Sequence, residues 1–310
     1  MKARKSGRRR LKGLSRTAES AVLKREVFGR LKLDKWLKIL KELAGYDEAG
    51  DFLRARCKKR AVTFGVALVP LLFFLFMWGG DKEFWVPGAV LGTGVLIAGG
   101  LLVYCLIRNR RLKDLDLSND FRTVLVPFLT AIREDVPSKD KIKLKLDLTG
   151  PSKAKVIRKL EPVQRGGKKV QETVYSDRWC NMEAPLAAGN RITLDILNIY
   201  RRYKISGSNP GGKHKWKTKW KKLVVVRASM SSVAGRFGFD PVIVQQKSKE
   251  YGLKLKKGFE GETVAVKMKK KFKSAGPTPP SDSIHPKEIL GMFLRLESLI
   301  RPIPTGSLKA

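Results

Sequence analysis

The sequence predicts an α+β membrane protein, a two-helix transmembrane hairpin plus a cytoplasmic antiparallel β-rich domain with flanking helices. Three observations predict this class. They are two long uncharged apolar runs, a two-residue periodicity that begins after residue 139, and a formal net charge of +37 from 65 Lys and Arg against 28 Asp and Glu. So large a positive charge favours an anionic partner and opposes compaction through self-repulsion.

The two apolar runs are residues 61–80 and 84–107, and neither contains Asp, Glu, Lys, Arg or His. A helix rises ~1.5 Å per residue, so each run is long enough for the ~30 Å hydrocarbon core of a bilayer. The alternative is a pair of buried core helices, which uncharged runs of this length rarely form. Because intramembrane charges usually mark ion pathways, we expect an anchor rather than a transporter.

The charges flanking these runs predict the orientation. Residues 1–60 carry 20 basic and 7 acidic side chains, and the basic stretch 108–113 follows the second run. The turn at residues 81–83 has a single lysine. Lys and Arg are retained on the cytoplasmic side. We therefore expect an integral membrane protein with both termini cytoplasmic.

Small residues in the second run are candidates for helix packing, because they let two helix backbones approach closely. Alternatively, they only reflect how common glycine is in membrane helices. The candidates, at small-xxx-small spacing, are Gly88, Gly92, Gly94 and Ala98.

The segments before the hairpin are predicted from charge and periodicity. Residues 1–18 hold eight basic and no acidic side chains, typical of a disordered tail, although a mitochondrial transit peptide has a similar composition. Residues 19–60 are predicted as a helical cytoplasmic segment, with a break at residues 45–50. The apolar stripe behind that prediction is Leu33, Trp36, Leu37, Leu40 and Leu43.

Two further helical segments flank the predicted β-rich domain. Residues 108–138 are predicted as a linker and an amphipathic helix, capped by Asn119 or Asp120 and divided at Pro127. A Pro- and Ser-rich linker follows the domain at residues 274–286. The C-terminal helix and tail span residues 286–310. Its apolar face is expected either to cover the sheet or to lie on the membrane.

Residues 139–273 are predicted as one basic β-rich domain of six or seven strands. Apolar and polar residues alternate there, as in a half-buried strand. Residues 190–205 and 213–229 flank a Gly-, Pro- and Asn-rich turn and predict an antiparallel hairpin. The other expected strands are residues 141–148, 168–175, 251–257 and 263–272.

Residues 207–213 match the phosphate-loop pattern G-x-x-x-x-G-K, but the context differs. The next residue is His214 where Ser or Thr would bind Mg²⁺, and a strand-like run follows where a helix is required. We expect a hairpin turn. No other catalytic or cofactor motif is present, and Cys57, Cys105 and Cys180 suggest neither a disulfide nor a zinc site. No cofactor, metal site or catalytic residue is predicted.

Lysines recur at every second position in the expected strands. Alternate residues of a strand share a face, so each row of lysines should lie on one side of its strand. A plain solvated face is the alternative, but such a face normally mixes Glu with Lys. The residues predicted to form an anion-binding face are Lys141, Lys143, Lys145, Lys213, Lys215, Lys217, Lys219, Lys221, Lys254, Lys256, Lys267, Lys269 and Lys271.

The favoured function is non-enzymatic: the basic domain binds anionic lipid headgroups or an acidic partner, as a scaffold or assembly factor at the bilayer. The alternative is a membrane-tethered binder of single-stranded nucleic acid, although Trp216 and Trp220 are expected in the core, opposite the lysines. An enzyme with a non-linear carboxylate site is the third hypothesis. Its acids would be Asp147, Asp177, Glu183 and Asp195.

Overall fold

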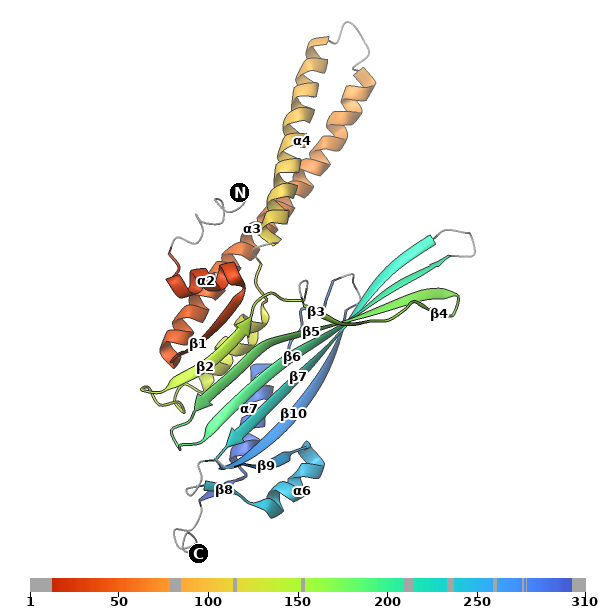
Figure 1. Cartoon of the computed structure of the whole chain (residues 1–310). Coiled ribbons are helices and arrows are strands. Elements are labelled where there is room, and N and C mark those ends of the chain that lie inside the picture. Colours follow the sequence, from red (N-terminus) through yellow and green to blue (C-terminus); the bar gives the residue numbers. More distant parts are fainter. Residues whose placement is uncertain are drawn as a thin grey trace, which may run out of the picture. The chain divides into compact units, whose positions relative to one another are not determined.

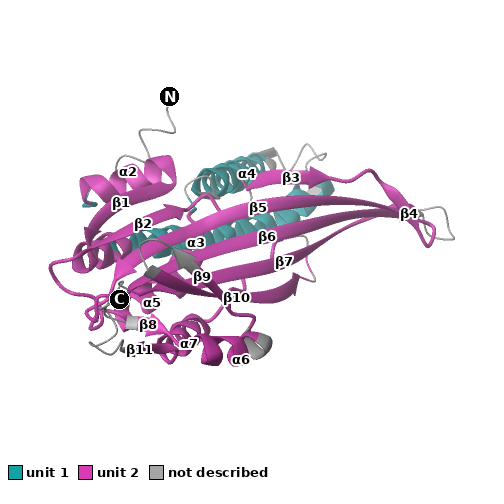
Figure 2. Cartoon of the chain, turned by 60° about the horizontal axis from the view of Figure 1, so that its bottom comes forward, with its two compact units in different colours: residues 1–14, 42–116 teal, residues 15–41, 117–310 magenta. Residues whose placement is uncertain are grey.

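The computed structural model describes residues 13–78, 85–113, 116–151, 154–208, 214–232, 237–258, 261–274, 276 and 278–302. The chain divides into two compact units. One comprises residues 1–14 and 42–116, and the other residues 15–41 and 117–310 (Figure 2). The first is built from two long apolar helices and the second around a nine-stranded antiparallel sheet.

The two long helices are α3 (Leu33–Trp78) and α4 (Trp85–Lys113). Both are long and apolar enough to cross a membrane, and their apolar stretches are mostly unburied within the protein. They pack together where a Cβ on Gly94 would lie 3.7 Å from Leu71 Cδ2, and Ala98 is buried. A Cβ on Gly92 would have no neighbour within 4 Å among the described residues. The surroundings of Gly88 lie outside the described residues.

The helix α3 is continuous through residues 45–50, where the sequence predicted a break. That prediction was wrong because an interior glycine costs only about 1 kcal/mol relative to alanine and keeps its amide hydrogen bond. Farther along α3, Arg54 forms ion pairs with Asp51 and with Asp116, the residue that follows α4 after a short gap. This guanidinium therefore links α3 to the segment that follows α4.

The nine-stranded sheet has one continuous path with two short strands attached (Figure 1). The path is β1 (Glu26–Lys32), β2 (Lys141–Asp147), β5 (Lys168–Pro185), β6 (Arg191–Ser208), β7 (His214–Ser231), β10 (Gly261–Ser274) and β9 (Lys254–Gly258). The strands β3 (Lys155–Lys159) and β4 (Val163–Arg165) both pair with β5. The predicted hairpin is confirmed, because β6 and β7 pair antiparallel over their whole length.

The first strand of the sheet comes from a segment that was predicted to be helical. Helix α2 (Arg16–Lys24) begins at Ser15, whose hydroxyl accepts a hydrogen bond from the Ala18 amide. It ends at Arg25, which has a positive φ of 56°. Residues 26–32 then form β1 and pair with β2. The helical prediction was wrong here because pairing with a strand distant in sequence overrides local propensity.

One face of the sheet, the inner face, carries the apolar core. It holds Ile142, Leu144 and Leu146 of β2, all fully buried. Trp36, in the first turns of α3, donates a hydrogen bond from Nε1 to the Ile142 carbonyl oxygen over 3.0 Å. This hydrogen bond links the start of α3 to β2.

Three helical segments pack on this inner face or beside it. The π-helix η2 (Phe121–Leu125) leads directly into α5 (Val126–Ala131), whose first turn contains Pro127, so the predicted division is confirmed. The C-terminal helix α7 (Pro286–Glu297) contacts β7 and β10, and its Phe293 ring lies 5.6 Å from that of Phe128. The apolar face of α7 therefore covers the sheet.

A smaller substructure was not predicted. Strands β8 (Phe237–Phe239) and β11 (Ile300–Pro302) pair with each other, and helix α6 (Pro241–Tyr251) follows β8. The Asp240 side chain caps α6 by accepting hydrogen bonds from the amides of Val242 and Ile243. An Asp followed by Pro is a helix-start signal that the sequence did contain.

Candidate anion-binding face

The strand register brings the separate lysine rows onto one face of the sheet. Residues directly opposite each other on antiparallel strands share a face. One row of such partners crosses the sheet from β2 to β9: Lys143, Glu183, Thr193, Ser229, Ala265 and Lys254. Within each strand, alternate residues stay on that side. This side, opposite the inner face, is called the basic face below.

Every lysine of the predicted set that the structure describes occupies a strand position on the basic face. They are Lys141, Lys143, Lys145, Lys215, Lys217, Lys219, Lys221, Lys254, Lys256, Lys267, Lys269 and Lys271. Lys213 lies outside the described residues. The register adds cations that the sequence analysis did not list: Arg30, Lys32, Arg191, Arg201, Arg227 and Lys273.

Carboxylates neutralise one half of this face. Glu26 lies 3.3 Å from Lys145 Nζ, and Glu183 lies 3.1 Å from Arg191 and 4.0 Å from Lys143. Asp195 of β6 likewise lies 3.1 Å from the Arg178 guanidinium. These carboxylates compensate several cations of β1, β2 and the adjoining ends of β5 and β6, although Arg30 lies opposite Lys143 and Lys32 opposite Lys141. We call this region the neutralised half.

The lysines of β7, β9 and β10 form the uncompensated half. Within the part of the chain that the structure describes, none of them on the basic face makes an ion pair. Lys221 instead lies directly between two cations, with Arg201 opposite it on β6 and Lys273 opposite it on β10. The charge of Lys269, above all other causes, lowers the pKa of Lys267. This half is electrostatically crowded and open to an external anion.

The two tryptophans of β7 have different environments. Trp220 is buried on the inner face, as predicted, and the Arg202 guanidinium lies 5.7 Å from its ring centroid. Trp216 is 78% exposed, so its predicted place in the core was wrong. The reason is that β10 ends at Ser274, the partner of Trp220, and thus does not extend alongside Trp216.

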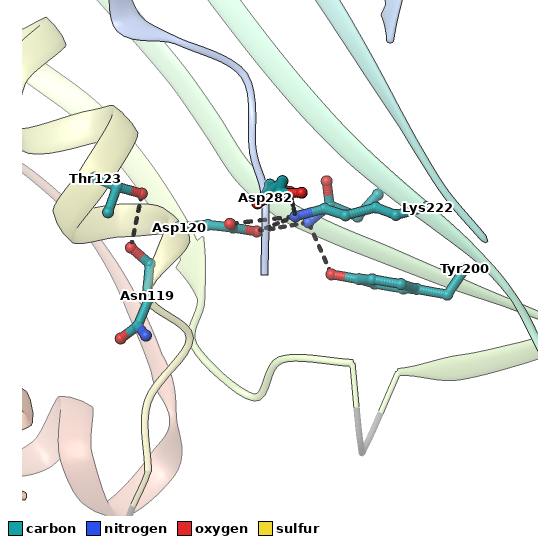
Figure 3. Close-up of polar contacts among 7 residues, drawn as sticks. Asn119, Asp120, Thr123, Tyr200, Lys222 and Asp282 are labelled. Atoms are coloured by element: carbon teal, nitrogen blue, oxygen red, sulfur yellow. Dashed lines mark hydrogen bonds and ion pairs between the residues drawn. The ribbon is translucent and has the colours of Figure 1, made fainter. Parts of the chain in front are cut away.

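The inner face holds a buried ion pair that the sequence analysis missed. Lys222 is only 2% exposed, and its Nζ lies 3.3 Å from both carboxylate oxygens of Asp120 (Figure 3). The same ammonium donates to the Asp282 carbonyl oxygen over 3.0 Å. Asn198 donates to Asp120 over 2.8 Å. Asp120 occupies the predicted cap position of η2 but makes no side-chain cap hydrogen bond, because its carboxylate binds Lys222 and Asn198 instead.

Asp177 is buried beside this pair. Neither of its carboxylate oxygens has a hydrogen-bond partner in the described part of the chain. Burial, then the negative charges of Asp147 and Asp120, raise its pKa to about 7, while Lys222 opposes the shift. Asp177 pairs across strands with Asn198 of the inner face, whereas Glu183 and Asp195 lie on the basic face. These three of the four acids considered for an enzymatic site therefore divide between the two faces.

Comparisons with protein-family models, with curated proteins and with solved structures found no match for this chain. Among the described residues, no group of three or more His, Cys, Asp and Glu side chains is placed to hold a metal ion. The three cysteines are free and buried, and burial strongly raises the pKa of Cys180. The basic face is the candidate site that the strand register assembles.

Proposed function

We propose that this chain is a non-enzymatic integral membrane protein whose basic face binds the anionic headgroups of a lipid surface, as a scaffold or assembly factor. The observation that carries the proposal is the shared phase of the lysine rows across the sheet. The two apolar helices supply the anchor, and the positive flanks favour cytoplasmic termini.

A lipid surface suits this arrangement because the cations are spread over several strands. Cytoplasmic leaflets carry anionic lipids, and each nearby Lys or Arg contributes ~1 kcal/mol to association. The uncompensated half has enough lysines for strong binding without a dedicated pocket. Anchoring by two helices further raises the local concentration of headgroups around the domain.

Single-stranded nucleic acid is less well supported. Its binders combine a basic groove with aromatic rings on which the bases stack. Here Trp216, the exposed tryptophan of β7, occupies a strand position on the inner face, whereas the lysines next to it in sequence occupy positions on the basic face. A strand bound along the lysines would therefore not reach that ring.

The test uses the full chain, because β1 and the first turns of α3, which contain Trp36, lie before α4 in the sequence and belong to the sheet unit. A fragment beginning after α4 would lack both. The protein is reconstituted in phosphatidylcholine nanodiscs and mixed with vesicles of phosphatidylcholine alone or with added phosphatidylserine. We expect co-flotation with the acidic vesicles only, and weaker binding as salt rises.

Equal co-flotation with neutral and acidic vesicles at low salt would contradict the proposal. A single-stranded oligonucleotide is included in a parallel binding measurement. Tight oligonucleotide binding without acidic-vesicle binding would favour the nucleic-acid alternative instead.

A further inference from the structure

A cavity of about 670 Å³ lies within the uncompensated half of the basic face. Its lining comes from five strands: β4, β5, β6, β7 and β10. The last pair between β7 and β10, Trp220 with Ser274, also borders it, so the cavity reaches the point where β10 ends. Its volume falls within the range of small-molecule sites, roughly 300–1,000 Å³.

The charged lining of this cavity is entirely cationic. Arg165 of β4 and Lys273 of β10 contribute to it, with Lys217, Lys219 and Lys221 between them on β7. None of these five side chains forms an ion pair within the described residues. Cations held this close repel one another, and an anion between them would relieve that repulsion.

The carboxylate opposite Tyr203 in the strand register is already engaged. Glu172 lies opposite Tyr203 on β5 but does not line the cavity. It accepts a hydrogen bond from the Tyr203 hydroxyl over 3.3 Å and lies 3.7 Å from the Arg201 guanidinium. Glu172 is therefore held by neighbours other than the lining lysines.

The lining also has an apolar portion. Val170 and Ile205 are direct cross-strand partners, and the ring of Tyr203 adjoins them two residues along β6. Lys221 Nζ lies 5.2 Å from the centroid of that ring, which holds its charge at the cavity. A single phosphate ion would meet the lysines but leave the apolar portion uncovered.

We propose that this cavity binds a compact, multiply phosphorylated ring, such as the headgroup of a polyphosphorylated inositol lipid. Two or more phosphates would contact the Lys217, Lys219 and Lys221 row, and the carbon skeleton of the ring would cover Tyr203. This inference rests on the proposed function and narrows it, because it adds one selective site to a face that otherwise binds by charge density. The same chemistry is presented by a soluble inositol polyphosphate and by the lipid.

The experiment separates these two sources. Full chain in phosphatidylcholine nanodiscs is titrated with inositol hexakisphosphate by calorimetry. In a second arm it is mixed with vesicles containing either phosphatidylinositol bisphosphate or phosphatidylserine at equal total charge. We expect saturable binding of the soluble probe, and stronger co-flotation with the bisphosphate vesicles than with the phosphatidylserine vesicles.

The pocket variant is Lys217→Gln with Lys221→Gln, and the control is Lys267→Gln with Lys269→Gln. Both remove two charges from exposed positions of the uncompensated half. Lys269 is four residues from Lys273 along β10, roughly 13 Å in a strand. We expect the pocket variant to lose on the order of 100-fold in affinity for the soluble probe, since two charge-assisted contacts are removed, and the control to lose about threefold or less. Thermal unfolding of both variants checks that they fold.

Equal loss in the two variants would overturn the selective site while leaving binding by the whole face intact. No binding of the soluble probe together with no preference for the bisphosphate vesicles would also overturn it, even if phosphatidylserine vesicles bind. Probe binding that persists without any acidic-vesicle binding would support the cavity for a soluble ligand and contradict the lipid function.

Discussion

Lys221 and Lys222 are adjacent in sequence but lie on opposite faces of the sheet, and their surroundings differ completely. Lys222 is buried and bound to Asp120 and to the Asp282 carbonyl. Lys221 is exposed and lies between two cations, with its ammonium 5.2 Å from the centroid of the Tyr203 ring. A buried charge costs several kcal/mol unless it is paired, while an exposed one is stabilised by water. Lys222 is therefore paired within the fold, whereas the charge of Lys221 is not compensated by an ion pair among the described residues.

Asp177 shows a second way in which the inner face accommodates a buried ionisable group. It is buried without a hydrogen-bond partner among the described residues, and its pKa rises to about 7. A neutral carboxylic acid avoids most of the cost of burying a charge. The comparison of the two faces thus predicts opposite responses to substitution and to pH.

The largest expected effect is that of Lys222→Ala. Removing the ammonium leaves the Asp120 carboxylate buried without its counter-ion, so the free energy of unfolding should fall by about 3–5 kcal/mol. Urea unfolding of the reconstituted chain measures it. Lys221→Ala is the matched control and should change that free energy by less than about 0.5 kcal/mol.

A double substitution sharpens this result. Lys222→Met together with Asp120→Asn removes both charges and should recover a substantial part of the loss. Equal destabilisation by Lys222→Ala and Lys221→Ala would show that the two faces do not differ as described.

Trp220 and Trp216 provide the next comparison. Trp220→Ala removes a buried ring that packs against Tyr175 and Arg202, and should cost about 3 kcal/mol of stability. Trp216→Ala removes an exposed ring and should cost less than about 0.5 kcal/mol. Comparable losses in the two variants, measured by thermal unfolding, would contradict the environments assigned to them.

Asp177 predicts a pH dependence of stability. The pKa of Asp177 is higher in the folded state than the ordinary aspartate value of 3.8, so the folded state binds more protons between pH 3.8 and about pH 7. The stability from this group is fully present below about pH 4 and is lost as pH rises through about 7, with roughly 2–3 kcal/mol lost between pH 5 and pH 8. Asp177→Asn should flatten that part of the stability curve, and an unchanged curve in the variant would contradict the assignment.

The smallest effects concern the two halves of the basic face. Lys269→Gln relieves repulsion in the uncompensated half and should raise the melting temperature by about 1 °C. Lys145→Gln breaks the exposed ion pair with Glu26 and should leave it unchanged or lower it by about 1 °C. Differential scanning calorimetry at low salt compares the two variants, and the opposite signs should disappear at high salt.

The sequence predicted features that depend on local periodicity. Alternation along each strand is enough to place Lys217, Lys219 and Lys221 on one side of β7, and the Gly- and Pro-rich turn predicts its pairing with β6. Alternation does not show whether different strands have the same phase, because one residue more or less in a turn reverses every side chain. The single basic face therefore emerged only from the register.

The missed features depend on contacts between distant residues. Lys222 and Asp120 are 102 positions apart in the sequence. Strand β1 pairs with β2, which follows both apolar helices in the sequence. The sequence did contain one signal. The pair Lys221 and Lys222 interrupts the alternation and puts one lysine on the tryptophan side, which requires a buried partner.

The most direct test of the account compares the two halves of the basic face in one vesicle-binding measurement. The first triple variant of the full chain is Lys267→Gln, Lys269→Gln and Lys271→Gln. The second is Lys141→Gln, Lys143→Gln and Lys145→Gln. Each is reconstituted in phosphatidylcholine nanodiscs, and its affinity for phosphatidylserine vesicles is measured. At ~1 kcal/mol per charge, the first set should lower affinity on the order of 100-fold. The second set, in which Lys143 and Lys145 are already paired with carboxylates, should lower it less than about tenfold. Unchanged affinity in the first variant would contradict the claim that the uncompensated half binds the acidic surface.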